Sequence, residues 1–369
     1  MTTRRDIIVL GAGVVGLSTA RRLLALGARV TVLDPSNPGG QGSRAAAGVA
    51  IPSVRLLEDP EMLDFTSAGR EALAEDLAAL GGGGLRRGGG ILRPMADDKA
   101  RLALEAKAGA RAEGWLGRWA PADEVAALEP ALAGAPIAGA FVNDEGFMVD
   151  TDAYLSALLH DVAARGAEVR LSEAALHIAD SGSGVEVRTL HGALKSDLLL
   201  VAAGAWSGVL PGLPALPVKP QRGQMMTVFH PRVRLTRIVS GPAYLAPWRA
   251  GEVVVGATEE DAGFACHTTP AGLLHLSATV ARLSPVLRDA RFTHSWAGLR
   301  STTPNGRPLL GRYPGTERTW LATGHGGQGI LTGGLTGRAV AELMESGRSE
   351  VAAPFDPKRA LADLRRSEG

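Results

Sequence analysis

The residues best placed to do chemistry are three glycines and one carboxylate near the start of the chain. Gly11-Ala-Gly-Val-Val-Gly16 follows a short apolar run, and Asp34 ends a second apolar run further along. Gly11 permits a tight turn, Gly13 lets the backbone approach a pyrophosphate, and Gly16 lets the next helix pack against the sheet. Asp34 can accept hydrogen bonds from ribose hydroxyls. The pattern predicts a dinucleotide site, without distinguishing FAD from NAD.

A second glycine loop, Gly324 to Gly329, lies between a strand-like segment, Thr319 to Thr323, and a helix-like segment. The helix N-terminus would offer N–H groups and a positive dipole end to an anion. A reduced flavin carries negative charge near N1 and the C2 carbonyl, which such groups can stabilise. Two such loops favour an extended ligand such as FAD over a mononucleotide. An ordinary turn between strand and helix is the alternative at each loop.

Arg300 and Tyr244 are the candidates for contact with a substrate. Arg300 ends the apolar, strand-like segment Trp296 to Arg300. A guanidinium that faces a pocket can hold a carboxylate through two parallel hydrogen bonds. A surface position for Arg300 and a structural role for Tyr244 are the alternatives. The histidines show no metal-ligand spacing, so no metal site is expected.

Composition narrows the class of protein. The chain has 369 residues, enough for two domains, and 45% apolar and 21% charged residues are ordinary for a soluble globular protein. A net charge of +1 argues against a nucleic-acid partner. The single cysteine, Cys266, permits no disulfide within the chain. No signal-peptide core and no run of 18 apolar residues are visible, so we expect a cytoplasmic protein without a membrane span.

The spacing of apolar residues predicts alternating strands and helices first, then a region of antiparallel strands, and then strands and helices again. Asp6–Leu10 and Arg29–Asp34 read as strands around a helix, 61–80 and 96–116 as long helices, and several strands follow from 218. This order predicts a nucleotide domain assembled from separated segments, with a sheet-based second domain inserted. The expected ranges are 1–85, 140–215 and 300–369 for the nucleotide domain, and 86–139 and 216–299 for the substrate domain.

Short motifs along the chain carry a resemblance to a known family. They are Ser43 to Gly48, Pro220 to Gln224, Val255 to Thr258, Trp296 to Arg300 with Gly306 to Gly311, and Gly324-His325 with Gly329-Ile330. From Ile7 to about Met344 the chain resembles the D-amino acid oxidase superfamily of FAD amine oxidases. It is most similar to the glycine oxidases of the thiazole branch of thiamine synthesis, and it is also similar to cyanide-forming glycine dehydrogenase subunits.

The resemblance implies an α/β fold: a Rossmann-like, glutathione-reductase-type FAD domain and an inserted α+β substrate domain on a large, mostly antiparallel sheet. It implies non-covalent FAD, because Cys266 lies outside the flavin motifs and Ser301 to Thr303 stand where related sarcosine oxidases offer an attachment cysteine. The expected FAD-binding residues are Gly11, Gly13, Val14, Val15, Gly16, Asp34, Pro35, Gly42, Ser43, Arg44, Ala45, Ala46, Ala47, Gly48, Ala175, Gly204, His325, Gly326, Gly327, Gln328, Gly329, Ile330 and Leu331.

The resemblance also makes Arg300 the anchor of the substrate carboxylate and Tyr244 a second polar contact. The expected substrate pocket departs from the family pattern. Gly327 stands where the glycine oxidases carry an arginine, beside Gln328, and Val49 and Glu259 replace pocket methionines. These changes predict a reshaped pocket that is open to a larger or N-substituted amino acid.

The expected reaction is oxidation of glycine, sarcosine or a small D-amino acid. Hydride passes from the α-carbon to flavin N5, an imine forms, and dioxygen is reduced to hydrogen peroxide. A dehydrogenase that uses a quinone or a partner subunit is one alternative, and a flavin-binding subunit without catalysis is another. Members of the family are often homotetramers, so a homo-oligomer is an expectation from the resemblance alone.

Overall fold

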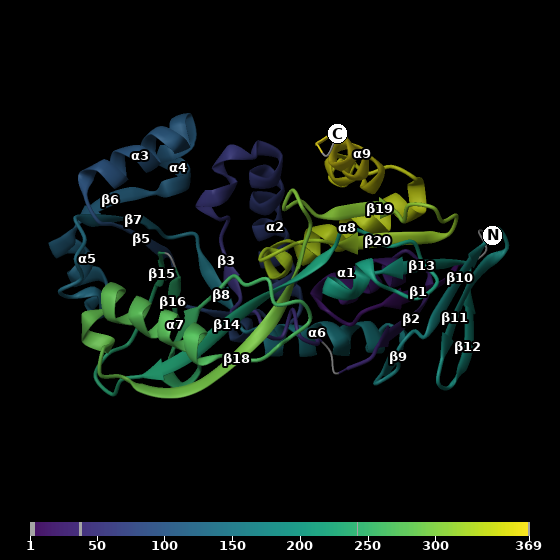
Figure 1. Ribbon diagram of the computed structural model, residues 1–369, viewed down its shortest axis with the longest axis horizontal. Coiled ribbons are helices and arrows are strands. Elements are labelled where there is room, and N and C mark those ends of the chain that lie inside the picture. The colour runs from purple at the N-terminus through teal and green to yellow at the C-terminus, as the bar shows by residue number, and fades with distance from the viewer. Residues whose placement is uncertain (1–3, 37–38, 242, 368–369) are drawn as a thin grey trace.

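A largely parallel sheet of six strands forms one half of the molecule in the computed structural model, which describes residues 4–36, 39–241 and 243–367. Its strand order is β19-β20-β13-β1-β2-β9 (Figure 1). The strands are β1 (Asp6–Leu10), β2 (Arg29–Asp34), β9 (Glu168–Leu171), β13 (Leu198–Val201), β20 (Thr319–Thr323) and the antiparallel edge strand β19 (Leu309–Arg312). The first expected strand–helix–strand unit is therefore confirmed.

Alternation along β1 explains how this sheet is covered on both faces. Ile7 and Val9 pack into a core with helices α1 (Val14–Ala25), α2 (Pro60–Ala79), α6 (Thr151–Ala164) and α8 (Gly329–Ser346). Ile8 and Leu10 pack into a second core, beneath a small antiparallel sheet. That sheet consists of β10 (His177–Ser181), β11 (Gly184–Thr189) and β12 (Gly192–Ser196). A strand buried on both faces suits the interior of a parallel sheet.

The other half is built on a sheet of eight strands in the order β18-β14-β17-β16-β15-β5-β7-β6 (Figure 1). All its pairings are antiparallel except β15 with β5. The strands are β5 (Ile91–Met95), β6 (Arg118–Pro121), β7 (Gly139–Asn143), β14 (Lys219–Phe229), β15 (Ile238–Ser240), β16 (Tyr244–Pro247), β17 (Val253–Gly256) and β18 (Arg291–Thr302). Helices α5 (Ala122–Leu128) and α7 (Pro270–Leu283) contribute to the core on one face. The fold expected from the sequence is confirmed in class.

Several helices and strands differ from those predicted from the sequence. The helix expected over 96–116 is broken into α3 (Asp98–Ala108) and α4 (Ala112–Leu116), because Gly109 takes a φ of +55°. Strands β10 and β12 and the C-terminal helix α9 (Pro357–Ser367) were not expected. Strands β7 and β18 cross two of the expected domain limits, and residues 1–3 and 368–369 of those ranges lie outside the described residues. The division into domains stays a prediction.

Three helices that frame the nucleotide half are packed unusually closely. A Cβ added at Gly333 of α8 would lie 2.8 Å from Cγ2 of Val14 on α1, and one added at Gly337 would lie 2.6 Å from the carbonyl carbon of Ser18. A Cβ at Gly69 of α2 would lie 3.0 Å from the carbonyl oxygen of Leu331 on α8. These glycines let backbones approach where any side chain would force them apart.

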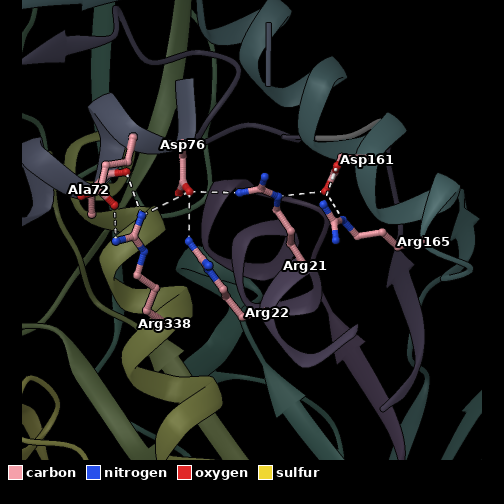
Figure 2. A network of polar contacts seen from close by, with 8 residues as sticks. Arg21, Arg22, Ala72, Asp76, Asp161, Arg165 and Arg338 are labelled. Carbon is pink, nitrogen blue, oxygen red and sulfur yellow. Dashed lines mark hydrogen bonds and ion pairs between the residues drawn. The ribbon is translucent and has the colours of Figure 1, made fainter. Parts of the chain in front are cut away.

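Asp76 of α2 ties these helices together with charge (Figure 2). Its carboxylate is 3% exposed and receives hydrogen bonds from Arg21 (3.0 Å) and Arg22 (3.2 Å) of α1 and from Arg338 (3.4 Å) of α8. Arg21 also binds Asp161 of α6 at 2.8 Å. Several cations on one buried carboxylate satisfy its desolvated charge and fix the helix positions. No helix among the described residues is long and apolar enough to cross a membrane.

We predict that Gly337→Ala destabilises the protein, whereas Gly114→Ala does not. In most helices this substitution stabilises by up to about 1 kcal/mol. At Gly337 the new methyl would collide with the Ser18 backbone and cost about 1–3 kcal/mol, whereas the described residues leave open space around Gly114 in α4. Urea unfolding of both variants measures the difference, and equal stabilities would contradict the close contact.

Candidate active site

A cavity of about 1070 Å³ lies at the meeting of the two halves. Gly11 and Asp34 line it from the six-stranded half, and Tyr244 and Arg300 line it from the eight-stranded half. Ligand pockets are usually about 300–1,000 Å³, so this one is large for a single small molecule. The volume suits an extended ligand together with a small substrate.

The first glycine turn places a helix end on this cavity. Gly11 has a φ of +110°, and a Cβ there would lie 2.3 Å from the carbonyl oxygen of Ala202. A Cβ at Gly16 would lie 1.9 Å from the carbonyl oxygen of Gly11, so Gly16 serves the packing of α1 and does not line the cavity. Gly13 precedes α1 and has no side chain to cap it, and no acid occupies the first turn. The Val14 N–H donates to the Ser43 hydroxyl at 3.1 Å, which leaves the other N–H groups of this turn for a ligand. The positive end of α1 is thus available to an anion.

Asp34 is held in the cavity wall by local hydrogen bonds. Its Oδ2 accepts from the Ala12 N–H at 2.7 Å, and its Oδ1 accepts from the N–H (2.9 Å) and hydroxyl (2.8 Å) of Ser36. A carboxylate has about four acceptor sites, so capacity is left for a ribose hydroxyl.

The second glycine loop brings the N-terminus of α8 to the same cavity. Gln328 precedes α8 without a side-chain cap, and the first turn again has no acid. His325 is buried in this loop, with Nε2 3.0 Å from Oγ1 of Thr336. Burial lowers the pKa of His325 to about 4, so its imidazole is neutral at pH 7. The loop therefore offers backbone N–H groups and a helix end, not a histidine cation.

Arg300 and Tyr244 stand over the cavity face of the eight-stranded sheet. Arg300 Nη1 donates to the carbonyl oxygen of Thr258 at 3.0 Å, and no described acid pairs with it. A Cβ at Gly223 would lie 2.7 Å from Nη1, so that glycine makes room for the guanidinium. The Tyr244 hydroxyl donates to Sδ of Met225 at 3.5 Å. Burial raises the pKa of Tyr244 to about 12, which keeps the phenol neutral and able to donate.

A buried polar cluster fixes the strand end that receives Arg300. The Thr258 hydroxyl accepts from the Gln224 N–H at 2.8 Å and donates to the Glu260 carboxylate. Glu260 also accepts from Arg222 and from the Gln224 side chain. Burial alone would raise the pKa of Glu260, but these hydrogen bonds hold it below its ordinary value. The ionised Glu260 thus holds Thr258, whose carbonyl orients Arg300.

Most of the expected site residues line the cavity. They are Gly11, Gly13, Val14, Val15, Asp34, Pro35, Gly42, Ser43, Ala45, Ala46, Ala47, Gly48, Val49, Ala175, Gly204, Tyr244, Glu259, Arg300, His325, Gly326, Gly327, Gln328, Gly329 and Ile330. Glu259 is ion-paired with Arg55 at 2.7 Å.

Three expected FAD-binding residues do not reach the cavity wall. Gly16 packs α1 against the first turn, as described above. Arg44 lies 3.5 Å from the Asp152 carboxylate. Leu331, the third residue of α8, is buried in the helix-covered core.

Arg93 is one of the cavity residues that reasoning from the sequence missed. Arg93 lines the cavity from β5 and is buried. The sequence did hold a signal: Arg93 is two residues after Ile91 in the same strand, and residues two apart in a strand lie on the same face. Cys266 is absent from the residues that line the described cavity, and non-covalent attachment of FAD stays a prediction.

A family model described as FAD dependent oxidoreductase matches residues 6–343. The chain belongs to this family. The bifunctional protein ThiO/ThiG of Nostoc sp. (strain PCC 7120) is 32% identical over 364 residues, covering 94% of this chain and 53% of that protein. Glycine oxidase of Bacillus licheniformis is 30% identical over 352 residues, covering 93% and 94%. The chain thus spans about half the length of the ThiO/ThiG relatives.

Solved structures agree with this family. Glycine oxidase from Geobacillus kaustophilus has a TM-score of 0.83 at 28% identity, covering 96% of this chain and 99% of that one. Iminodiacetate oxidase from Chelativorans sp. BNC1 has a TM-score of 0.85 at 27% identity, covering 95% and 98%. The expected fold and family are confirmed.

FAD fits the observed cavity. Gly204 and Gly326 line it, and a Cβ added at either would meet no described atom within 4 Å, so free space runs along the wall. The α1 end would hold the diphosphate and Asp34 a ribose. The small side chains Ala45 to Ala47 leave room for a flat ring, and the α8 end would face negative charge on the flavin.

We predict that His325 makes stability depend on pH. The unfolded state takes up a proton near pH 6.5, whereas folded His325 does so only near pH 4, so stability is complete above pH 6.5 and is lost as pH falls towards 4. The loss from this residue is on the order of 3 kcal/mol. His325→Gln keeps a partner for Thr336 but does not titrate. Free energies of unfolding are measured for the wild type and His325→Gln from pH 7 to 4 at saturating FAD. The wild type should lose more stability than the variant as pH falls, and parallel profiles would contradict the prediction.

Proposed function

We propose that this chain is an FAD-dependent oxidase of a small amino acid. The observation that carries the proposal is the Arg300 guanidinium, which faces the cavity without an acidic partner among the described residues and close to the neutral phenol of Tyr244. When bound, FAD would accept the hydride from the substrate α-carbon at N5. The substrate would leave as an imine, and dioxygen would be the final acceptor, yielding hydrogen peroxide.

The residues of the chain supply binding and orientation. Arg300 can hold the substrate carboxylate through two parallel hydrogen bonds, and Tyr244 can donate a third. Fixing the carboxylate sets the direction of the α-hydrogen, and such positioning lowers the barrier substantially. His325 is neutral and already bonded to Thr336, so it is not assigned as a base. A substrate amine that binds in its neutral form needs no catalytic base.

The relatives support a small amino acid as the substrate, and one of them indicates that an N-substituted amino acid is also a candidate. Two of the proteins named above are glycine oxidases, and one is an iminodiacetate oxidase. A role in thiazole formation would follow the ThiO/ThiG relatives, of which this chain spans about half. Gly327 and Gln328 leave a pocket that differs from the family pattern, so the choice of amine has to be measured.

The experiment is anaerobic reduction of the purified yellow protein by a panel of amines. The panel contains glycine, sarcosine, D-alanine, D-proline and iminodiacetate. Bleaching by one or more of them supports the proposal, and no bleaching by any would point to a flavin-binding subunit without this activity. Comparing turnover with dioxygen and with a dye acceptor then separates an oxidase from a dehydrogenase.

We predict that Arg300→Met raises the substrate KM at least tenfold, because charge-assisted hydrogen bonds contribute about 1.5–3 kcal/mol each. The flavin content should stay unchanged, since the expected FAD contacts lie elsewhere. Arg288→Met is the matched control, because Arg288 is exposed and does not line the cavity. Steady-state kinetics with the best amine measure both variants. Wild-type KM in Arg300→Met would remove Arg300 from the site.

A further inference from the structure

The strand that carries Arg300 is an edge strand, and its outer edge is bonded to the other half of the molecule. β18 pairs with β14 on one side and extends towards α8 (Figure 1). On the outer edge, the Leu299 N–H donates to the carbonyl oxygen of Gln41 at 2.8 Å. Two residues further on, the Ser301 carbonyl oxygen accepts from the Gly326 N–H at 2.7 Å. The backbone on either side of Arg300 is thus held by two loops of the nucleotide half.

The Ser301 hydroxyl extends this contact into the second glycine loop. Ser301 follows Arg300 directly in the strand, so the two side chains leave the backbone on opposite faces. Ser301 Oγ lies 2.9 Å from Oγ1 of Thr323, the last residue of β20, and accepts from the Gly324 N–H at 3.0 Å. A Cβ added at Gly324 would lie 2.7 Å from Cγ2 of Thr303, so the end of β18 and the loop are in close contact.

The direction of these hydrogen bonds follows from the number of hydroxyl protons. Thr323 has one hydroxyl proton and donates it to the carbonyl oxygen of Gly204 at 3.0 Å. The Ser301 hydroxyl therefore donates to Thr323 and accepts from Gly324. Gly204 begins the short helix η5 (Gly204–Gly208) and lines the cavity. One chain of hydrogen bonds thus joins three parts of the cavity wall: β18, the second glycine loop and η5.

Loss of the Ser301 hydroxyl would leave two buried groups without their partners. Thr323 is 1% exposed and Gly324 is buried, so water does not readily replace the missing hydroxyl. The Gly324 N–H would lose its acceptor and the Thr323 oxygen would lose its donor, which favours a shift of the loop. The same loop leads into the N-terminus of α8, so its N–H groups would move relative to β18.

We propose that Ser301 is a positioning residue that holds the second glycine loop at a fixed distance from Arg300. The proposal rests on the proposed function, in which Arg300 holds the substrate carboxylate and the α8 end faces the flavin. A displacement of about 1 Å between reacting groups can lower a rate about 100-fold. The guanidinium itself is oriented by the Thr258 carbonyl, which the Ser301 hydroxyl does not contact. Removing that hydroxyl should therefore slow hydride transfer more than it weakens substrate binding.

Anaerobic flavin reduction by the best amine separates binding from chemistry. The dependence of the reduction rate on amine concentration gives a limiting rate constant and a dissociation constant. Ser301→Ala should lower the limiting rate constant at least tenfold and leave the dissociation constant within about threefold. Ser301→Thr keeps the hydroxyl and should retain most of the rate. Ser295→Ala is the matched control and should behave as the wild type, because Ser295 is also half-buried on β18 but does not line the cavity.

Sulfite provides a second measurement that needs no turnover. Its sulfur electron pair forms a bond to N5 of an oxidised flavin, which leaves negative charge on N1 and the C2 carbonyl. The loss of flavin absorbance during a titration gives the dissociation constant. Ser301→Ala should weaken sulfite binding at least tenfold, because displaced N–H groups stabilise that charge less well. Thr323→Val breaks the same chain at the next hydroxyl, so it should also weaken sulfite binding, and it carries the test if Ser301→Ala does not fold.

Thermal unfolding and flavin content verify that each variant is folded and loaded with FAD. A wild-type rate and sulfite affinity in Ser301→Ala would overturn the proposal, and so would a weaker amine complex with an unchanged limiting rate. An equal loss in Ser301→Thr would also overturn it, because the hydroxyl would then not be the group that matters. If no amine reduces the wild-type flavin, the proposed function fails, while the sulfite titration still decides whether Ser301 positions the loop. If amines reduce the wild type and Ser301→Ala equally, the role of Ser301 fails alone.

Discussion

The close contact between α1 and α8 is the constraint on which the site depends. Each helix begins at a glycine loop, has no capping side chain on its own N-cap residue and carries no acid in its first turn. Gly333 and Gly337 bring the two backbones together, and Asp76 holds both through arginines (Figure 2). In the proposed function both helix ends would face one extended cofactor, which requires their separation to be held closely. Packing without side chains and a buried carboxylate provide that rigidity.

The substrate half meets a different requirement, since it has to present long polar side chains from a flat surface. Alternation along β5, β15 and β16 sends apolar residues to the α7 core and leaves Arg93, Ser240 and Tyr244 on the cavity face. Arg300 reaches the same space because Gly223 on the neighbouring strand has no side chain. Its direction is set by the Thr258 carbonyl, which the ionised Glu260 holds in place through the Thr258 hydroxyl. Sheet geometry and one absent side chain thus build the pocket.

Local signals were enough to predict the first strand–helix–strand unit of the nucleotide half. The glycine turn, the flanking apolar runs and Asp34 lie within one strand–helix–strand unit, so spacing alone specified them. Arg300 and Tyr244 are far apart in the chain, and only the family resemblance brought them together. Arg93 escaped both routes, because its burial follows from the pairing of β5 with β15 and β7, which no local pattern records. The break at Gly109, where φ is +55°, was not predicted.

The two ends of the cavity differ in the kind of positive charge that they present. At the proposed cofactor end, the groups available to negative charge are helix termini and a neutral histidine, which carry partial charges or none. At the proposed substrate end, the Arg300 guanidinium carries a full positive charge. A flavin has to change its charge during turnover, so a site of backbone dipoles can stabilise the reduced form without trapping it. A substrate carboxylate keeps its charge throughout, and a full guanidinium can bind it with no penalty at the reacting step. Among the described residues Arg300 has no acidic partner, and in the proposed function that partner would arrive with the substrate.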